Sequence, residues 1–107
     1  EYTSILKMQE DVSDADGATI RIAHSMPKVV DPEIAEKTTW TLEYRVPFAL
    51  FTNYFGCPAP RQGDQWRANF YKCADATSHP HWGSWAPVVT ERPNFHQPAY
   101  FQPIAFA

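Results

Sequence analysis

The sequence predicts an all-β protein that folds as an antiparallel sandwich with long connecting loops. Apolar and polar residues alternate in several short segments, and turn residues separate those segments. Ten prolines fall mostly between the candidate strands. Proline disrupts helix interiors and central strands, so this distribution favours a sandwich over a helical bundle. A chain of 107 residues has room for one modest core, and we expect residues 1–107 to form one domain.

The clearest strand spans residues 40–46, where apolar and polar side chains alternate. One predicted face of this strand holds Trp40, Leu42, Tyr44 and Val46. Pro47 ends the strand, because proline cannot donate a hydrogen bond to a neighbouring strand. The next segment, 48–51, is expected to form a single helical turn or 3₁₀ segment that closes at Gly56.

Further strands are expected over 66–72, which follows a turn at 62–64, and over the terminal segment 103–107. Residues 19–23 also alternate, whereas 2–8 is a weaker candidate that periodicity could equally make helical. The predicted core includes Trp40, Leu42, Tyr44, Trp66 and Phe70.

Two segments between these strands are expected to be irregular. Residues 11–17 form an acidic turn, and 25–37 contain Pro27 and Pro32. The run that begins at Asp31 could open a short helix through Lys37 or remain a loop.

Composition excludes several classes of function. The formal net charge is −3 and the nine Lys and Arg residues are spread thinly, which argues against a nucleic-acid footprint. No apolar run approaches the roughly 20 residues needed to cross a bilayer. The chain begins at Glu1 without an initiator Met or a signal-peptide pattern, so we expect an excised or processed piece of a longer protein.

The two cysteines, Cys57 and Cys73, permit one disulfide. Their spacing matches no known motif, and unpaired cysteines are commonly buried. Two buried or half-buried thiols are therefore the simpler interpretation, with a disulfide left open.

Aromatic residues concentrate in the last third of the chain, in segments punctuated by proline. Trp82 and Trp85 flank Gly83-Ser84, and Phe95 precedes His96. Rings set in loops just before a terminal strand are typical of a surface that stacks on flat or ring-shaped ligands.

Four blocks of the sequence, taken in order, resemble the C-terminal half of carbohydrate-binding modules of family 9. These blocks are 40–48, 63–72, 84–87 and 95–101. The resemblance implies a jelly-roll-type β-sandwich and an exported protein of a polysaccharide-using bacterium, located extracellularly, in the periplasm or at the cell surface.

The sequence departs from the family pattern in two ways. Gln102 stands where the family tends to have Gly after the closing Phe, so the turn there is expected to differ. The N-terminal strands that complete the sandwich in family members are missing, which predicts an incomplete sandwich and self-association through exposed sheet edges.

The resemblance also implies site residues. Phe95 matches a position where family members can carry a ring, often Trp, that stacks on sugar. Arg92 and His96 flank it and could hydrogen-bond sugar hydroxyls, or could be solvated loop residues. Trp82 lies outside the family block and is expected to be exposed. Trp85 is a candidate ligand residue, but its block favours a buried structural role, and Phe95 is as well suited to a core.

Metal binding has little support in the sequence. His79-Pro80-His81, with His24 and His96 elsewhere, does not supply a zinc-site spacing. The segment 12–23 imitates a calcium-binding EF-hand loop but has Val12 and Ala23 at the outer ligand positions, which excludes that motif. No cofactor is expected; a looser structural calcium site at Asp11, Asp14 and Asp16 is left open.

Catalysis is not expected either. Glu43 has no evident carboxylate partner for glycoside hydrolysis, and Ser84 lacks the flanking glycines of a nucleophile elbow. The sequence thus predicts a non-catalytic carbohydrate-binding module of an exported polysaccharide-utilisation protein. The alternative is a structural or protein-interaction module that keeps the scaffold without a working sugar site. A third interpretation, an accessory domain of a glycoside hydrolase, differs in what is attached and not in what these residues do.

Overall fold

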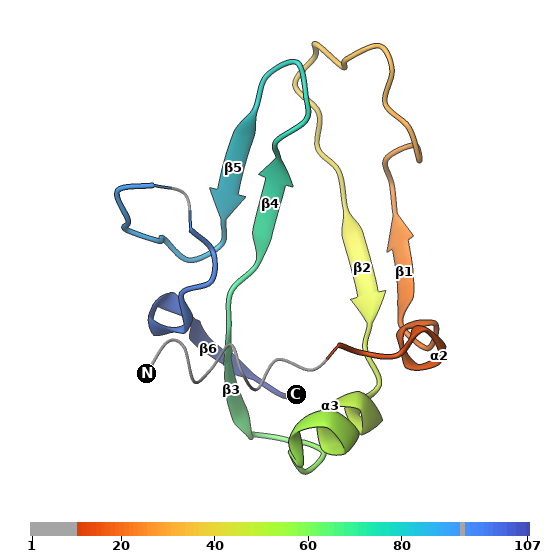
Figure 1. Ribbon diagram of the computed structural model, residues 1–107, viewed down its shortest axis with the longest axis vertical. Helices are drawn as coiled ribbons and strands as arrows, with labels where there is room; N and C mark the ends of the chain where they lie inside the picture. Colours follow the sequence, from red (N-terminus) through yellow and green to blue (C-terminus); the bar gives the residue numbers. More distant parts are fainter. Residues whose placement is uncertain (1–10, 93) are drawn as a thin grey trace. The chain divides into compact units, whose positions relative to one another are not determined.

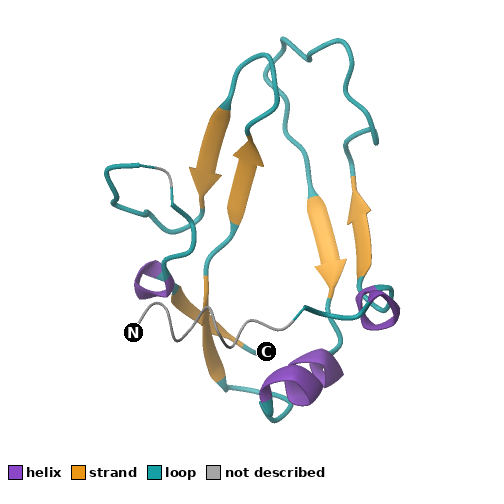
Figure 2. Cartoon of the chain, in the orientation of Figure 1, coloured by secondary structure: helices purple, strands orange, loops and turns teal. Residues whose placement is uncertain are grey.

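The computed structural model describes residues 11–92 and 94–107, and in these residues most regular structure is short antiparallel strands with a few short helices (Figures 1 and 2). This confirms the predicted all-β class. The chain divides into two compact units, 1–59 and 60–107. The weak candidate segment 2–8 lies outside the described residues.

Among the described residues, the first element of the first unit is a single helical turn, α2 (Asp14–Gly17), where the sequence predicted an acidic turn. Ser13 caps it, because its hydroxyl accepts a hydrogen bond from the Asp16 amide at 3.2 Å. The Tyr54 hydroxyl donates to the Asp16 carboxylate at 2.7 Å. The hydrogen bonds from Tyr54 and then Ser13 lower the pKa of the Asp16 carboxyl group.

Strands β1 (Arg21–His24) and β2 (Leu42–Arg45) form an antiparallel pair, which confirms strands in the predicted segments 19–23 and 40–46 with shorter bounds. Ile22 lies opposite Tyr44, and His24 lies opposite Leu42. Because side chains alternate along a strand, these four share one face. The connection between the strands is irregular throughout, so residues 32–37 form a loop, one of the two expected alternatives.

Helix α3 (Phe48–Phe55) follows β2. Pro47 is its N-cap, and Gly56 ends it with a left-handed φ of 66°, as the sequence predicted. The Gly56 amide donates to the Thr52 carbonyl oxygen at 2.9 Å. The helix is longer than the single turn expected, because its apolar residues continue through Phe55 before the glycine stops it.

In the second unit, the single strand predicted over 66–72 is two strands, β3 (Gln65–Ala68) and β4 (Tyr71–Ala74). The side chain of Asn69 accepts the Phe70 amide hydrogen bond at 2.9 Å, so that amide is not available to a strand partner. The chain changes partners at this point. β3 pairs with the terminal strand β6 (Gln102–Ala105), whereas β4 pairs with β5 (His81–Ser84). A 3₁₀ turn, η1 (Pro98–Tyr100), precedes β6.

The predicted core is wrong for most of its members. Trp40, Leu42, Tyr44 and Phe70 are 41–52% exposed, and Trp66 is half-buried with its ring edge-on to Phe106. The buried apolar side chains of the described residues are instead Leu50, Ala74 and Ala86. Each described sheet has two strands, and a two-stranded ribbon cannot shield one of its own faces from solvent.

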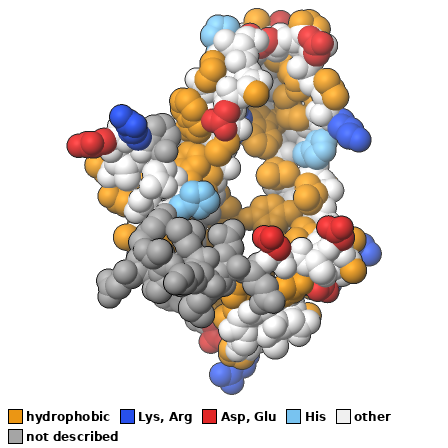
Figure 3. Space-filling model, in the orientation of Figure 1, with side chains coloured by type: hydrophobic (Ala, Val, Ile, Leu, Met, Phe, Trp, Pro, Cys, Tyr) orange, Lys and Arg blue, Asp and Glu red, His pale blue; other side chains and the backbone are white. Residues whose placement is uncertain are grey.

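On the face drawn in Figure 3, the Lys and Arg side chains appear at separate places. This dispersion agrees with the thin spread of positive charge along the sequence. Within the described residues, no helix has the length and apolar character needed to cross a membrane.

Candidate functional site

An open pocket of about 250 Å³ lies in the second unit, beside β5 and the loop that follows it. Its lining combines two aromatic rings, one glycine, one valine and three uncharged polar side chains. The lining residues are Trp82, Gly83, Ser84, Val88, Thr90, Asn94 and Phe95.

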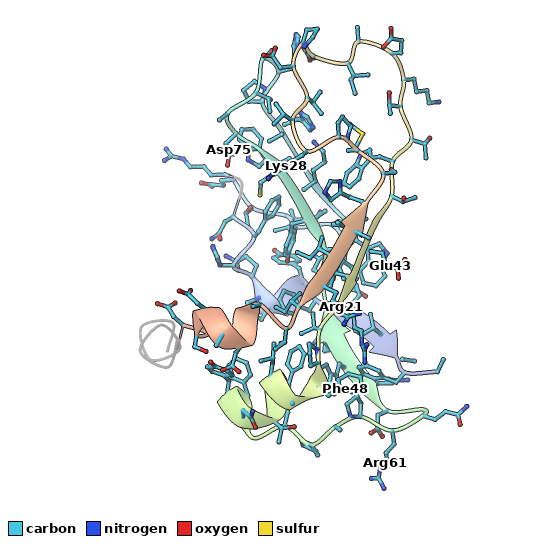
Figure 4. The ribbon with its side chains drawn as sticks, turned by 90° about the vertical axis from the view of Figure 1, so that its right-hand side faces the viewer. Arg21, Lys28, Glu43, Phe48, Arg61 and Asp75 are labelled. Carbon is cyan, nitrogen blue, oxygen red and sulfur yellow. The ribbon has the colours of Figure 1, made fainter. Side chains whose placement is uncertain are left out.

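Trp82 reaches this pocket from strand β5, whereas the sequence predicted a loop position. It lies opposite Cys73 in the register with β4, and its side chain is 47% exposed, as expected. Its indole Nε1 donates to Asp75 Oδ1 at 2.5 Å. Asp75 follows the end of β4 (Figure 4). Since the indole N–H is used in this bond, Trp82 offers mainly its ring face to a ligand.

Phe95 reaches the same pocket from the loop after β5, and it is half-buried. Its ring stacks on Tyr71 of β4, with centroids 4.3 Å apart and planes 15° from parallel. The Tyr71 hydroxyl is buried and has no hydrogen-bond partner among the described residues. An unpaired buried hydroxyl costs about 1–3 kcal/mol, so the structure keeps this ring under Phe95 at some expense in stability.

Hydrogen bonds from two side chains to backbone groups hold the loop that carries Phe95. The Asn69 side chain accepts from the Ala86 amide at 2.9 Å and donates to the Ala86 carbonyl oxygen at 3.0 Å. Farther along, the Tyr100 hydroxyl donates to the Val89 carbonyl oxygen at 2.8 Å. The loop is thus anchored at Ala86, next to β5, and again at Val89.

Sequence reasoning did not identify the polar lining residues. The Thr90 hydroxyl donates to the Arg92 carbonyl oxygen at 2.6 Å, and Asn94 Oδ1 accepts from the His96 amide at 3.1 Å. Together with Ser84, these side chains give the pocket hydroxyl and amide groups that can donate and accept hydrogen bonds. Single polar residues in an irregular loop form no sequence pattern, so no signal in one sequence could have selected them.

The structure brings together two of the five predicted site residues, since Trp82 and Phe95 line one pocket. Arg92 and His96 are exposed and are not among its lining residues. The expected buried role of Trp85 is wrong: its side chain is 54% exposed, with its ring edge-on to Phe70 at a centroid distance of 5.6 Å. Trp85 follows the short strand β5, and the β4–β5 pair has no third strand among the described residues that could cover the ring.

The described residues contain no cluster of three or more His, Cys, Asp or Glu side chains that could hold a metal ion. Asp16, a member of the suggested calcium site, accepts hydrogen bonds from Tyr54 and Ser13 instead. The calcium site therefore stays a prediction.

Both cysteines are free thiols; Cys57 is half-buried as expected, whereas Cys73 on the two-stranded β4–β5 ribbon is exposed.

Comparisons with known proteins agree with this geometry. The family model for carbohydrate-binding family 9 matches residues 8–106. A crystal structure of a candidate carbohydrate-binding protein from Bacteroides uniformis ATCC 8492 is 29% identical in sequence, with a TM-score of 0.68. The match covers 90% of this chain and 43% of that protein, so the chain spans less than half of the neighbour's length. The comparison with curated proteins gave no match.

Proposed function

The chain belongs to carbohydrate-binding family 9, and on that basis we propose that it binds a sugar, without catalysis, in the pocket beside β5. The observation that supports this most is the meeting of Trp82 and Phe95 in one open pocket, although they come from a strand and a loop. The C–H faces of a sugar ring pack well on such rings, and the polar lining matches its hydroxyls.

The lining favours an uncharged sugar. Among the described residues, the pocket has hydroxyl and amide side chains but no Lys, Arg, Asp or Glu. A carboxylate-bearing sugar would have no cationic partner there to offset the loss of its hydration. We therefore propose neutral sugars as the ligand class, with uronic acids excluded.

The same lining supports a binding role without chemistry. Glycoside hydrolysis uses a pair of carboxyl groups that flank the scissile bond, and the lining residues carry none. We propose that any bond cleavage in the biological process is performed by another domain or protein. We also propose, from the usual setting of the family, that the protein is exported and acts in polysaccharide utilisation. Cell fractionation tests whether it is exported.

Calorimetry on the full-length protein tests the proposed function. The probes are glucose, galactose, mannose, xylose, glucuronic acid and galacturonic acid, with the soluble disaccharides of the neutral sugars. Binding of at least one neutral sugar is expected, and Trp82→Ala and Phe95→Ala should each weaken it about tenfold or more, by analogy with stacking on nucleic-acid bases worth about 1–3 kcal/mol.

The matched control for the two ring substitutions is Trp40→Ala, because Trp40 is a similarly exposed tryptophan in the first unit. It should leave sugar affinity unchanged. Normal affinity in both pocket variants would assign these rings to the scaffold. Absence of binding to every probe would favour a structural or protein-interaction module instead.

We propose that sugar binding needs no metal ion. Exhaustive dialysis against EDTA should leave the affinity for the best neutral sugar of the panel unchanged. A loss that added Ca²⁺ reverses would instead support the acidic segment at Asp11, Asp14 and Asp16 as a calcium site.

A further inference from the structure

We infer that Tyr71, on strand β4, and Asp75, directly after that strand, are positioning residues. They hold the two rings of the pocket in place before a ligand arrives. This inference rests on the proposed sugar-binding function. Among the described residues, Trp82 has a partner in Asp75 and Phe95 has a partner in Tyr71. Neither partner is among the lining residues of the pocket.

The register of the hairpin explains why both partners come from one segment. Tyr71 lies opposite Ser84 and Cys73 lies opposite Trp82, so all four side chains share a face of the β4–β5 pair. Asp75 follows two residues after Cys73, which continues the same alternation just past the strand. One short stretch of chain therefore presents partners to a ring on β5 and to a ring on the loop.

Asp75 fixes the direction of the Trp82 ring. Without a partner for Nε1, the indole could turn about its side-chain bonds, because nearly half of its surface is exposed. The 2.5 Å hydrogen bond to the Asp75 carboxylate is charge-assisted and restricts this rotation. A ring already held in its binding orientation loses less conformational entropy when a sugar stacks on it.

Tyr71 fixes the plane of the Phe95 ring. The two rings are nearly parallel, and Phe95 lies on a loop that is anchored at Ala86 and Val89 rather than at Phe95 itself. The stacking contact with Tyr71 thus joins this part of the loop to the hairpin. The Tyr71 hydroxyl has no hydrogen-bond partner in the part of the chain that the structure describes, so the aromatic ring and not the hydroxyl carries this role.

The test for Asp75 uses the full-length protein and the neutral sugar that binds it most tightly in the panel above. Asp75→Ala should weaken binding between about threefold and tenfold, and Asp75→Asn, which keeps an acceptor oxygen, should recover most of the loss. The matched control is Asp64→Ala, also in the second unit. The Asp64 carboxylate accepts a hydrogen bond from the Arg61 amide, and the substitution removes that carboxylate. This variant should stay within about twofold of the unsubstituted protein.

A double variant separates positioning from a general loss of stability. If Asp75 acts through the Trp82 ring, Asp75→Ala combined with Trp82→Ala should bind no more weakly than Trp82→Ala alone. Additive losses would overturn the role assigned to Asp75.

For Tyr71, the informative pair is Tyr71→Leu and Tyr71→Phe. The leucine variant removes the stacking partner and should weaken binding between about threefold and tenfold. The phenylalanine variant keeps the stack and should restore the affinity while raising the melting temperature, because it removes an unpaired buried hydroxyl. Tyr44→Leu is the control from an exposed strand position in the first unit. Equal affinity in the leucine and phenylalanine variants would overturn the role of Tyr71.

A measurement without sugar keeps this inference separate from the proposed function. The Trp82 indole N–H signal, followed by NMR, should exchange with solvent several-fold faster in Asp75→Ala than in the unsubstituted protein, and Asp64→Ala should not change it. If no probe sugar binds, the proposed function fails, and the exchange rate alone then decides whether Asp75 holds the ring. Unchanged exchange would overturn the positioning role whatever the sugar result.

Discussion

The two hairpins of the molecule, β1–β2 and β4–β5, have the same construction but different surroundings. Each is an antiparallel pair of four-residue strands. On β1–β2, the shared face presents Ile22, Leu42 and Tyr44, which are 66%, 52% and 48% exposed. On β4–β5, the loop after the second strand places Phe95 on Tyr71, and a pocket forms beside Trp82.

This difference shows that exposed rings on a hairpin do not by themselves make a pocket. The pocket depends on a loop that is held by hydrogen bonds from Asn69 and Tyr100. The residues that create the site are therefore partly side chains that no ligand would touch. Substitutions at these anchors should affect binding, whereas comparable substitutions in the first unit should affect stability alone.

Asn69→Ala should have the largest effect. The side chain makes hydrogen bonds with the Phe70 amide and with both backbone groups of Ala86, which is only 3% exposed. Its loss leaves the two backbone groups of the buried Ala86 without their partner, so we expect the free energy of unfolding to fall by about 2–4 kcal/mol. Sugar affinity should fall as well. Urea unfolding and calorimetry measure the two effects.

The matched control for this substitution is Asn53→Ala, on the exposed face of helix α3. Alanine favours a helix more than asparagine does, so stability should stay the same or rise slightly. If Asn69→Ala reduced stability but kept full affinity, the loop anchor would not be what forms the pocket.

Gly56→Ala should reduce stability in the first unit by about 1–2 kcal/mol, because a side chain disfavours the left-handed conformation. Gly56 has a φ of 66°, and an added Cβ would meet nothing within 4 Å, so the cost is conformational and not steric. Gly17→Ala is the control, since that position also has open space and no left-handed φ. Thermal melts should separate the two variants, and neither should change sugar affinity.

Much of the fold could be predicted from the sequence wherever the local signals agreed. Alternation identified β2, and the pair Pro47 and Gly56 marked the start and end of α3. β5 was missed because His81-Trp82-Gly83-Ser84 does not alternate and contains glycine, which weakens a strand. This segment is a strand because it pairs with β4, and the residues of β4 lie outside the segment's own sequence.

The candidate site was only partly predictable for a similar reason. The aromatic residues Trp82 and Phe95 could be identified from residue type and, for Phe95, from the family resemblance. Asn69 interrupts what looked like one continuous strand, and its side-chain hydrogen bonds depend on Ala86, 17 positions away. Contacts of this range leave no periodic signal in one sequence.

Tyr100→Phe tests the second anchor of the loop and should have a smaller effect than Asn69→Ala. It removes one exposed hydrogen bond, to the Val89 carbonyl oxygen, worth about 0.5–1.5 kcal/mol. We expect sugar affinity to fall between about twofold and fivefold. Tyr44→Phe, on the uncovered hairpin, is the control and should leave the affinity unchanged. A larger loss than in Asn69→Ala would make Tyr100 the principal anchor.

The smallest expected effect is a pH dependence confined to the first unit. The pKa of Asp16 is lowered because its carboxylate accepts hydrogen bonds from Tyr54 and Ser13. A group whose pKa is lowered by folding stabilises the folded state above its unfolded pKa of about 4, and that contribution disappears as the pH falls through the lower, folded value. Tyr54→Phe removes the larger cause of the shift, so it should lower the melting temperature at neutral pH. The difference from the unsubstituted protein should shrink as the pH is taken below about 4. A difference that stayed constant with pH would show that Tyr54 stabilises α2 and α3 through its hydrogen bond to the Ser13 amide, at 2.9 Å, and not through the charge of Asp16.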